Sequence, residues 1–246
     1  MSYITFRNSF RYLFANLFVF AFSLASSYSS PSNIANDTIS FNFERKIIQK
    51  GSTETVKGIV YYKAPHRVFI DVNSPIKQVM VVDESKLTIY YPSDKKAFII
   101  KSRGLIPMPF IQSIISVMKD DYGLAEVGYS LIKHEKKDNR IYTYWNPPKE
   151  HKKHIGEFIL ATENDLLVYA EAKYPNSKSA AKSFYSKHID LNGKHFPLEI
   201  HTEIQEVSRK TDEYVTYSDV KLNIVLPKQA MDFKLPANTE VKEVSW

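Results

Sequence analysis

The segment 65–92 constrains the fold most, because its apolar residues recur at every second position between prolines and polar turn residues. A period of two places apolar side chains on one face of a β-strand. Prolines and Asn, Ser or Asp clusters typically mark the turns between such strands. The segment therefore predicts three short strands with one shared apolar face. Its apolar positions are Val68, Ile70, Val72, the run Val79 to Val82, Leu87, Ile89 and Tyr91.

The same alternation continues between Thr38 and Val225, with Asn192-Gly193 as the clearest two-residue hairpin signal. The chain has 16 Tyr and 15 Phe but only 7 Gly, which favours aromatic-rich strands over a glycine-rich nucleotide-binding fold. About eleven or twelve antiparallel strands of this kind must curl or close to protect their edges. We therefore expect a mainly β fold, an unclosed antiparallel β-barrel or curved half-barrel with a helical lid. The tail from Pro227 to Trp246 is expected to be irregular.

One segment has helical periodicity instead. Ile111, Ile114, Ile115 and Met118 follow the spacing i, i+3, i+4, i+7, and Pro109 suits a first helical turn. The helix is either a core helix packed on the sheet or a lid over a cavity.

The N-terminal segment 1–27 is typical of a signal peptide. Arg7 and Arg11 precede an apolar run of roughly thirteen residues, and small residues follow it. The run is shorter than the ~20 residues that span a bilayer. We expect cleavage between Ala25 and Ser30, with a retained anchor as the alternative. Export to a bacterial periplasm would leave a single domain over residues 28–246.

The sequence contains little that points to chemistry. It has no cysteine, which excludes disulfides, thiolate nucleophiles and a lipid-modified N-terminal cysteine. His151 and His154 lie in a charged turn, and Glu199, His201 and Glu203 share the parity of a solvent-facing strand side. Common nucleophile, phosphate-binding and zinc motifs are missing. We expect no catalytic residue, metal or cofactor and therefore no enzyme.

Charge makes nucleic acid an improbable partner. The formal net charge is +6, but the basic residues are interspersed with acidic ones and form no stripe.

A set of residues along the first strands resembles the LolA-type outer-membrane lipoprotein carrier family. The family's positions are occupied by Gly58, Lys63, Pro65, Pro75, Gln78, Asp83, Leu87, Tyr90 and Pro92, and the tail from Phe233 to Val241 is similar to the family's ending. The family's arginine before the first proline is Ala64 here. Lys63 or Arg67 is the candidate to replace it in release or partner contact.

The resemblance implies a concave apolar face, capped by helices, that takes up the acyl chains of lipoproteins or related lipids. It also implies an inner-membrane ABC-type release complex and an outer-membrane acceptor as partners of a monomeric carrier. The alternative is an envelope sensor or structural domain that uses the same fold to dock a protein. The candidate cavity and lid residues are Phe41, Phe43, Val68, Ile70, Val72, Leu87, Ile89, Phe98, Ile100, Phe110, Ile111, Ile114, Ile115 and Met118.

Overall fold

The computed structural model describes residues 38–64, 67–83, 86–101, 121–125, 128–149, 152–153, 155–175 and 180–245. The expected signal peptide over residues 1–27 and the expected helix over residues 109–119 lie outside these ranges. Among the described residues, no helix is long and apolar enough to cross a membrane.

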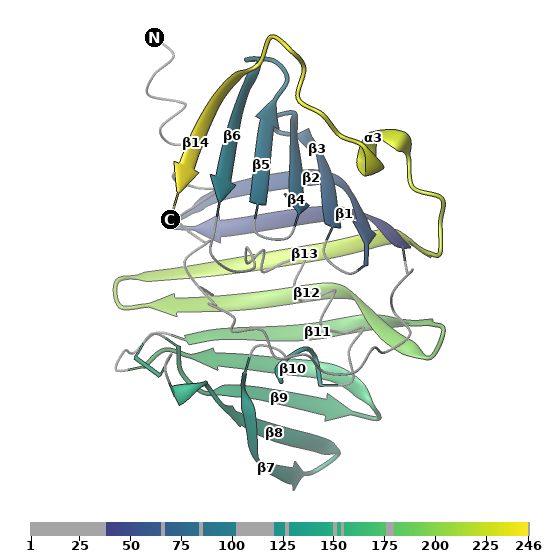
Figure 1. Cartoon of the computed structure of the whole chain (residues 1–246). Helices are drawn as coiled ribbons and strands as arrows, with labels where there is room; N and C mark the ends of the chain where they lie inside the picture. The colour runs from purple at the N-terminus through teal and green to yellow at the C-terminus, as the bar shows by residue number, and fades with distance from the viewer. Residues whose placement is uncertain are drawn as a thin grey trace.

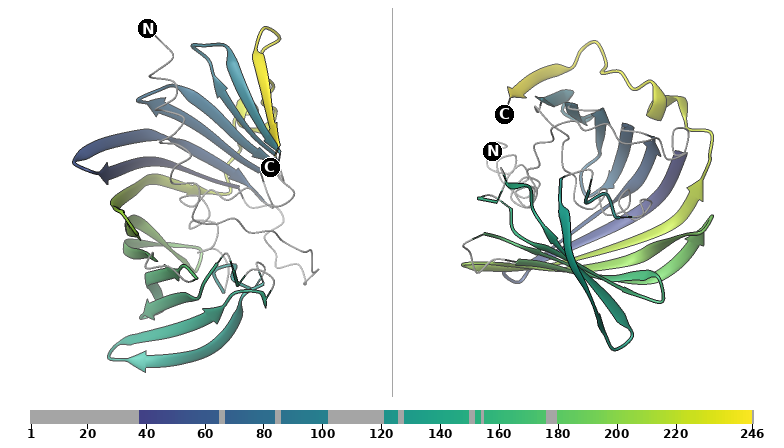
Figure 2. Two further views of the ribbon diagram at one scale, coloured as in Figure 1. Left: turned by 90° about the vertical axis from the view of Figure 1, so that its left-hand side faces the viewer. Right: turned by 60° about the horizontal axis from the view of Figure 1, so that its bottom comes forward.

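Fourteen strands of the described residues form one strongly curved sheet whose two edge strands stay apart (Figures 1 and 2). The spatial order is β14-β6-β5-β4-β3-β2-β1-β13-β12-β11-β10-β9-β8-β7. The expected unclosed, mainly β barrel is therefore confirmed. The strands are β1 (Thr38–Gln49), β2 (Ser52–Lys63), β3 (Arg67–Ser74), β4 (Gln78–Asp83), β5 (Lys86–Tyr91), β6 (Lys96–Lys101), β7 (Ser130–Lys137), β8 (Arg140–Asn146), β9 (Phe158–Glu163), β10 (Leu166–Lys173), β11 (Ala180–Leu191), β12 (Lys194–Glu206), β13 (Arg209–Leu222) and β14 (Glu240–Ser245).

Tight turns set the register of the hairpins. Asn192 and Gly193 join β11 to β12 with φ values of 55° and 81°. Two successive positive φ angles belong to a type I′ turn, whose twist matches that of the flanking strands. The hairpin predicted from this dipeptide is therefore confirmed.

The pairing of β1 with β13 joins the two halves of the sheet. Phe43 lies opposite Tyr217, and Arg45 lies opposite Val215, across this antiparallel pair. Residues from the beginning and the end of the described chain thus meet in the middle of the sheet.

The expectation of an irregular tail is wrong. Residues 227–246 contain the short helix α3 (Lys228–Met231) and the strand β14, which runs parallel to β6. The strand starts where the Glu240 amide donates to the Lys95 carbonyl at 2.8 Å. With β14, the described residues form fourteen strands, more than the expected eleven or twelve. A strand of this length whose partner lies so far back in the sequence has no local signal.

The tail covers the convex side of the sheet. Ala230 of α3 packs with Phe69, Val79, Val81 and Tyr90, and Phe233 and Leu235 pack against the same cluster. In Figure 2, α3 lies outside the curve formed by β1 to β5. Strands β3 to β5 are therefore buried on both faces, which explains the uninterrupted apolar run of β4.

Candidate functional site

The concave side of the sheet carries a continuous apolar cluster. It lies opposite the face that the tail covers. Its members alternate along the strands with the residues that face the tail, such as Phe69, Val79 and Val81. The cluster spans β1 to β6, β12 and β13. Its buried members are Ile39, Phe41, Phe43, Val56, Val60, Tyr62, Ala64, Val68, Ile70, Val72, Met80, Val82, Leu87, Ile89, Ile100, Phe196, Ile200, Val215 and Tyr217. We call this set the concave cluster.

Three aromatic rings of this cluster contact one another. The ring of Tyr217 lies 5.4 Å from that of Phe41 and 5.6 Å from that of Phe196, measured between centroids, and both pairs are edge-on. Phe41 and Phe196 are 6.2 Å apart. Edge-on pairs at these separations are favourable beyond the area they bury. The three rings therefore tie β1, β12 and β13 together within the concave cluster.

A second apolar cluster extends this face toward β9 and β10. It consists of Leu124, Tyr129, Ile155, Leu160, Leu167 and Ala170. Tyr185 of β11 packs against both clusters. Burial raises the pKa of Tyr185 to about 12, so its hydroxyl stays neutral at physiological pH. The two clusters therefore form one uncharged surface at the point where they meet.

The structure places most of the predicted cavity residues together. Eight of them belong to the concave cluster: Phe41, Phe43, Val68, Ile70, Val72, Leu87, Ile89 and Ile100. The ninth, Phe98, is buried, lies opposite Ile89 in the register of β5 and β6, and meets the Tyr91 ring at 6.2 Å. Phe110, Ile111, Ile114, Ile115 and Met118 lie outside the described residues. Whether any of these residues contacts a lipid stays a prediction.

Sequence reasoning missed the residues that β12 and β13 contribute. Phe196, Ile200, Val215 and Tyr217 belong to the concave cluster. The apolar alternation in these two strands is interrupted, because the polar residues Thr202, Thr211 and Glu213 occupy the same face further along. A period-two signal was nevertheless present, as Phe196, Leu198 and Ile200 in β12 and as Val215 and Tyr217 in β13.

One end of the concave face is polar. Arg45 Nη2 donates to Glu213 Oε2 at 2.7 Å, and Gln49 Nε2 donates to Thr211 Oγ1 at 2.6 Å. Burial by itself lowers the pKa of Arg45, but the adjacent Glu213 carboxylate outweighs it and holds the pKa above its ordinary value. Arg45 lies opposite Val56 and Val215, which are members of the concave cluster. The apolar surface therefore ends at a buried ion pair.

Ala64, at the position of the family's arginine, is buried in the concave cluster. Lys63 pairs with Arg67 in the register of β2 and β3. Both lie on the same face of the sheet as Tyr61 and Phe69, which is the convex face opposite the concave cluster. Arg67 Nη1 donates to Asp83 Oδ2 at 3.0 Å, and its Nε donates to the Ala230 carbonyl at 3.1 Å. Any role of Lys63 or Arg67 in release or partner contact, which stays a prediction, would be exerted from the convex side.

The convex side also has a hollow of about 530 Å³ beside the tail. Its lining combines apolar rings with charged ends of side chains. The lining residues are Tyr90, Lys228, Gln229, Asp232, Phe233, Lys234 and Pro236.

Comparison by sequence gives no assignment, since no family model and no curated protein matches the chain. Comparison by structure identifies the fold. A LolA superfamily protein from Nitrosomonas europaea superposes with a TM-score of 0.53 at 16% identity over 79% of this chain and 90% of its own. An outer membrane lipoprotein-sorting protein domain from Vibrio parahaemolyticus has a TM-score of 0.53 at 10% identity, over 80% of this chain and 89% of its own.

A DUF1329 family protein from Desulfovibrio piger is also similar, with a TM-score of 0.57 at 14% identity over 82% of this chain and 91% of its own. All three likenesses cover most of both chains while the sequences have diverged, so they bear on the fold. The curved, unclosed sheet with an apolar concave face is the LolA-like fold.

Proposed function

We propose that this protein is a non-enzymatic periplasmic carrier that shields the acyl chains of lipoproteins, or of related lipids, against its concave face. The observation that carries the proposal is the continuous layer of buried apolar side chains on that side, formed by the concave cluster and by the second cluster that Tyr185 joins to it. The lipoprotein-sorting description of a structural neighbour supports the same function.

The energetics of such a surface suit an acyl chain. Transfer of one CH₂ group from water to an apolar site is worth ~0.8 kcal/mol, so a sixteen-carbon chain could gain on the order of 12 kcal/mol. A carrier must use only part of this gain, because it has to release its cargo.

The polar end of the face gives the chain a direction. An acyl chain ends in a polar ester or carboxyl group, which is costly to bury without hydrogen bonds. The Arg45–Glu213 pair and the Gln49–Thr211 hydrogen bond lie where the apolar surface stops. We propose that the methyl end of the chain lies toward Phe41, Phe196 and Tyr217.

Handover would involve an inner-membrane ABC-type complex as donor and an outer-membrane acceptor. Export by a cleaved N-terminal segment and a monomeric state belong to the same proposal. The residues expected to contact cargo are the members of the concave cluster and, outside the described residues, the segment 110–118.

A fluorescent fatty-acid probe tests the proposal. Ile189 is half-buried at the margin of the concave cluster, so a charge there would meet the bound chain without being forced into the core. We expect Ile189→Glu to weaken probe binding at least tenfold, or about 1.4 kcal/mol. Val225, which is 95% exposed, supplies the control Val225→Glu, which should bind like the parent chain. Equal binding by the parent chain and a folded Ile189→Glu variant would count against this site.

Docking of a protein partner is the second candidate function. Strands β7 and β8 expose Leu131 (51%), Ile132 (49%) and Ile141 (45%), and β7 is an edge of the sheet. Unpaired edge strands with apolar neighbours can accept a partner strand. Failure of the chain to take up any acyl probe, together with a partner that protects β7 from hydrogen exchange, would favour this function.

A further inference from the structure

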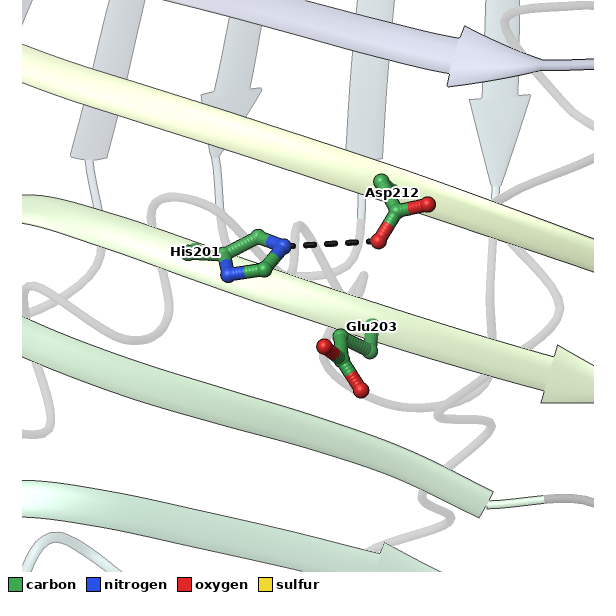
Figure 3. Close-up of side chains that lie close together, drawn as sticks. All are labelled: His201, Glu203 and Asp212. Carbon is green, nitrogen blue, oxygen red and sulfur yellow. Dashed lines mark hydrogen bonds and ion pairs between the residues drawn. The ribbon is translucent and has the colours of Figure 1, made fainter.

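Three side chains that can ligate a metal converge on the convex side of β12 and β13. Potential ligand atoms of His201, Glu203 and Asp212 all lie within 4.8 Å of one another. In Figure 3, the three side chains lie together across the two neighbouring strands, with His201 Nε2 directed at Asp212 Oδ1 over 3.4 Å. We propose that this cluster binds a divalent transition-metal ion of the Zn²⁺ class. The proposal is independent of the lipid function.

Regular strand geometry builds the cluster. His201 and Glu203 are two residues apart in β12 and so share a face. Asp212 lies directly opposite Glu203 in the register with β13. Ile200 belongs to the concave cluster, so its neighbour His201 points to the convex side. The ligand positions are therefore fixed by the same hairpin that supports the concave face.

Two aromatic rings hold the imidazole of His201 in place. The Tyr214 ring stacks on it at 4.3 Å between centroids with an interplanar angle of 1°, and the Phe184 ring lies on its other side in register at 5.9 Å and 28°. A ring clamped in this way loses little rotational freedom when it binds, which lowers the entropic cost of ligation.

The observed separation fits one ion shared by two ligands. Zinc sites have Zn–N and Zn–O distances of about 2.0–2.2 Å with tetrahedral geometry. Two tetrahedral ligands are then about 3.3–3.6 Å apart, and the His201 Nε2 to Asp212 Oδ1 distance is 3.4 Å. Glu203 comes from the same face and needs only a change of its flexible side chain to supply the third oxygen.

The donor set selects the class of metal. One imidazole and two carboxylates suit Zn²⁺ and its first-row neighbours, whereas Ca²⁺ and Mg²⁺ prefer all-oxygen sites. The side chains of His201 and Asp212 are 30% and 24% exposed. Water can therefore reach a fourth coordination position.

A lysine competes for the same oxygen. Lys210 Nζ lies 3.5 Å from Asp212 Oδ1 and is 57% exposed. Ion pairs with so exposed a cation contribute little, so Lys210 can move away when an ion binds. Its charge should nevertheless weaken binding, and we expect Lys210→Gln to bind metal more tightly than the parent chain.

Zinc titration of the full-length chain tests the site. The protein is purified without a histidine tag, stripped with a chelator and titrated with ZnCl₂ by calorimetry. We expect one-to-one binding that weakens at least about tenfold in Asp212→Asn, Glu203→Gln and His201→Gln. Co²⁺ in place of Zn²⁺ should give the visible absorption of a tetrahedral site, and Zn²⁺ should raise the melting temperature of the parent chain but not of these three variants.

Two histidine controls separate this site from others. His195 pairs with Asp190 at 4.0 Å, and His195→Gln should bind like the parent chain. His154→Gln removes the neighbour of His151 in the sequence and should also leave binding unchanged. Absence of saturable Zn²⁺ binding in the parent chain, or its loss in His154→Gln, would overturn the proposal. If His201→Gln fails to fold, Asp212→Asn and Glu203→Gln test the site instead, because they preserve the shape of the side chain. Unchanged Zn²⁺ binding in both variants would overturn the proposal.

Discussion

Gly58 lies directly beneath the ring of Phe43: a methyl group built on Gly58 would approach Phe43 Cε1 to 2.9 Å and would also collide with the Asp71 carbonyl oxygen. The two residues face each other in the register of β1 and β2. The glycine on which part of the resemblance to lipoprotein carriers rests therefore has a steric reason here. It lets an aromatic ring of the concave cluster approach the neighbouring strand closely.

The first prediction concerns this contact. Gly58→Ala should lower the free energy of unfolding by about 1–3 kcal/mol, because the backbone carbonyl of Asp71 cannot give way as a flexible side chain could. Urea denaturation measures the loss. Lys57→Ala, at the exposed neighbouring position, should change stability by less than about 0.5 kcal/mol, and similar losses for both variants would contradict the steric argument.

The second prediction concerns the ion pair at the polar end of the concave face. The side chains of Arg45 and Glu213 are only 15% and 11% exposed. Removal of one partner leaves a buried charge, so Glu213→Gln should destabilise the protein by about 3 kcal/mol. The control is the pair Lys101–Glu243, whose side chains are 55% and 57% exposed. Glu243→Gln should cost less than about 1 kcal/mol by the same denaturation assay.

The third prediction is a loss of stability in mild acid. Burial lowers the pKa of His188 below its ordinary value of 6.5, although its hydrogen bond to the Leu167 carbonyl acts in the opposite direction. The neutral ring is thus favoured in the folded state. Its contribution is present above pH 6.5 and is lost as the pH falls below this value, because the unfolded chain then binds a proton that the folded chain resists.

Unfolding measured at pH 7.5 and pH 5.5 checks this. His188→Gln should reduce the difference between the two pH values, whereas His134→Gln, on the exposed edge strand β7, should not. An unchanged pH dependence in His188→Gln would rule out His188 as the responsible group.

The fourth prediction concerns the tail. The Phe233 ring packs 5.9 Å from that of Phe69 and 6.1 Å from that of Tyr90. Since Phe233 is only half-buried, Phe233→Ala should cost about 2 kcal/mol, less than a core phenylalanine. It should also expose the convex side of β3 to β5, which binding of a hydrophobic dye would detect. Met231→Ala, at a residue 41% exposed, should do neither.

The sequence predicted those parts of the fold that leave a local signal. Alternation in β3 and β5 assigned Val68, Ile70, Val72, Leu87 and Ile89 to one face, and the structure buries them together. Asn192-Gly193 specified its hairpin because two positive φ angles need these residue types.

Long-range pairing left no such signal. β14 is a short strand whose partner β6 lies more than a hundred residues earlier. Because β14 pairs there, the tail before it runs across the convex face of β4. The convergence of His201 and Asp212 likewise depends on the register of β12 and β13, so the sequence showed only a polar strand side.

Native mass spectrometry of the chain isolated from the cell envelope tests the carrier function most directly. We predict a population with an added mass equal to an acyl-bearing lipid, which disappears in Ile189→Glu and persists in Val225→Glu. A folded protein that carries no lipid, and that takes up none when mixed with lipoprotein or fatty acid, would contradict the proposed function.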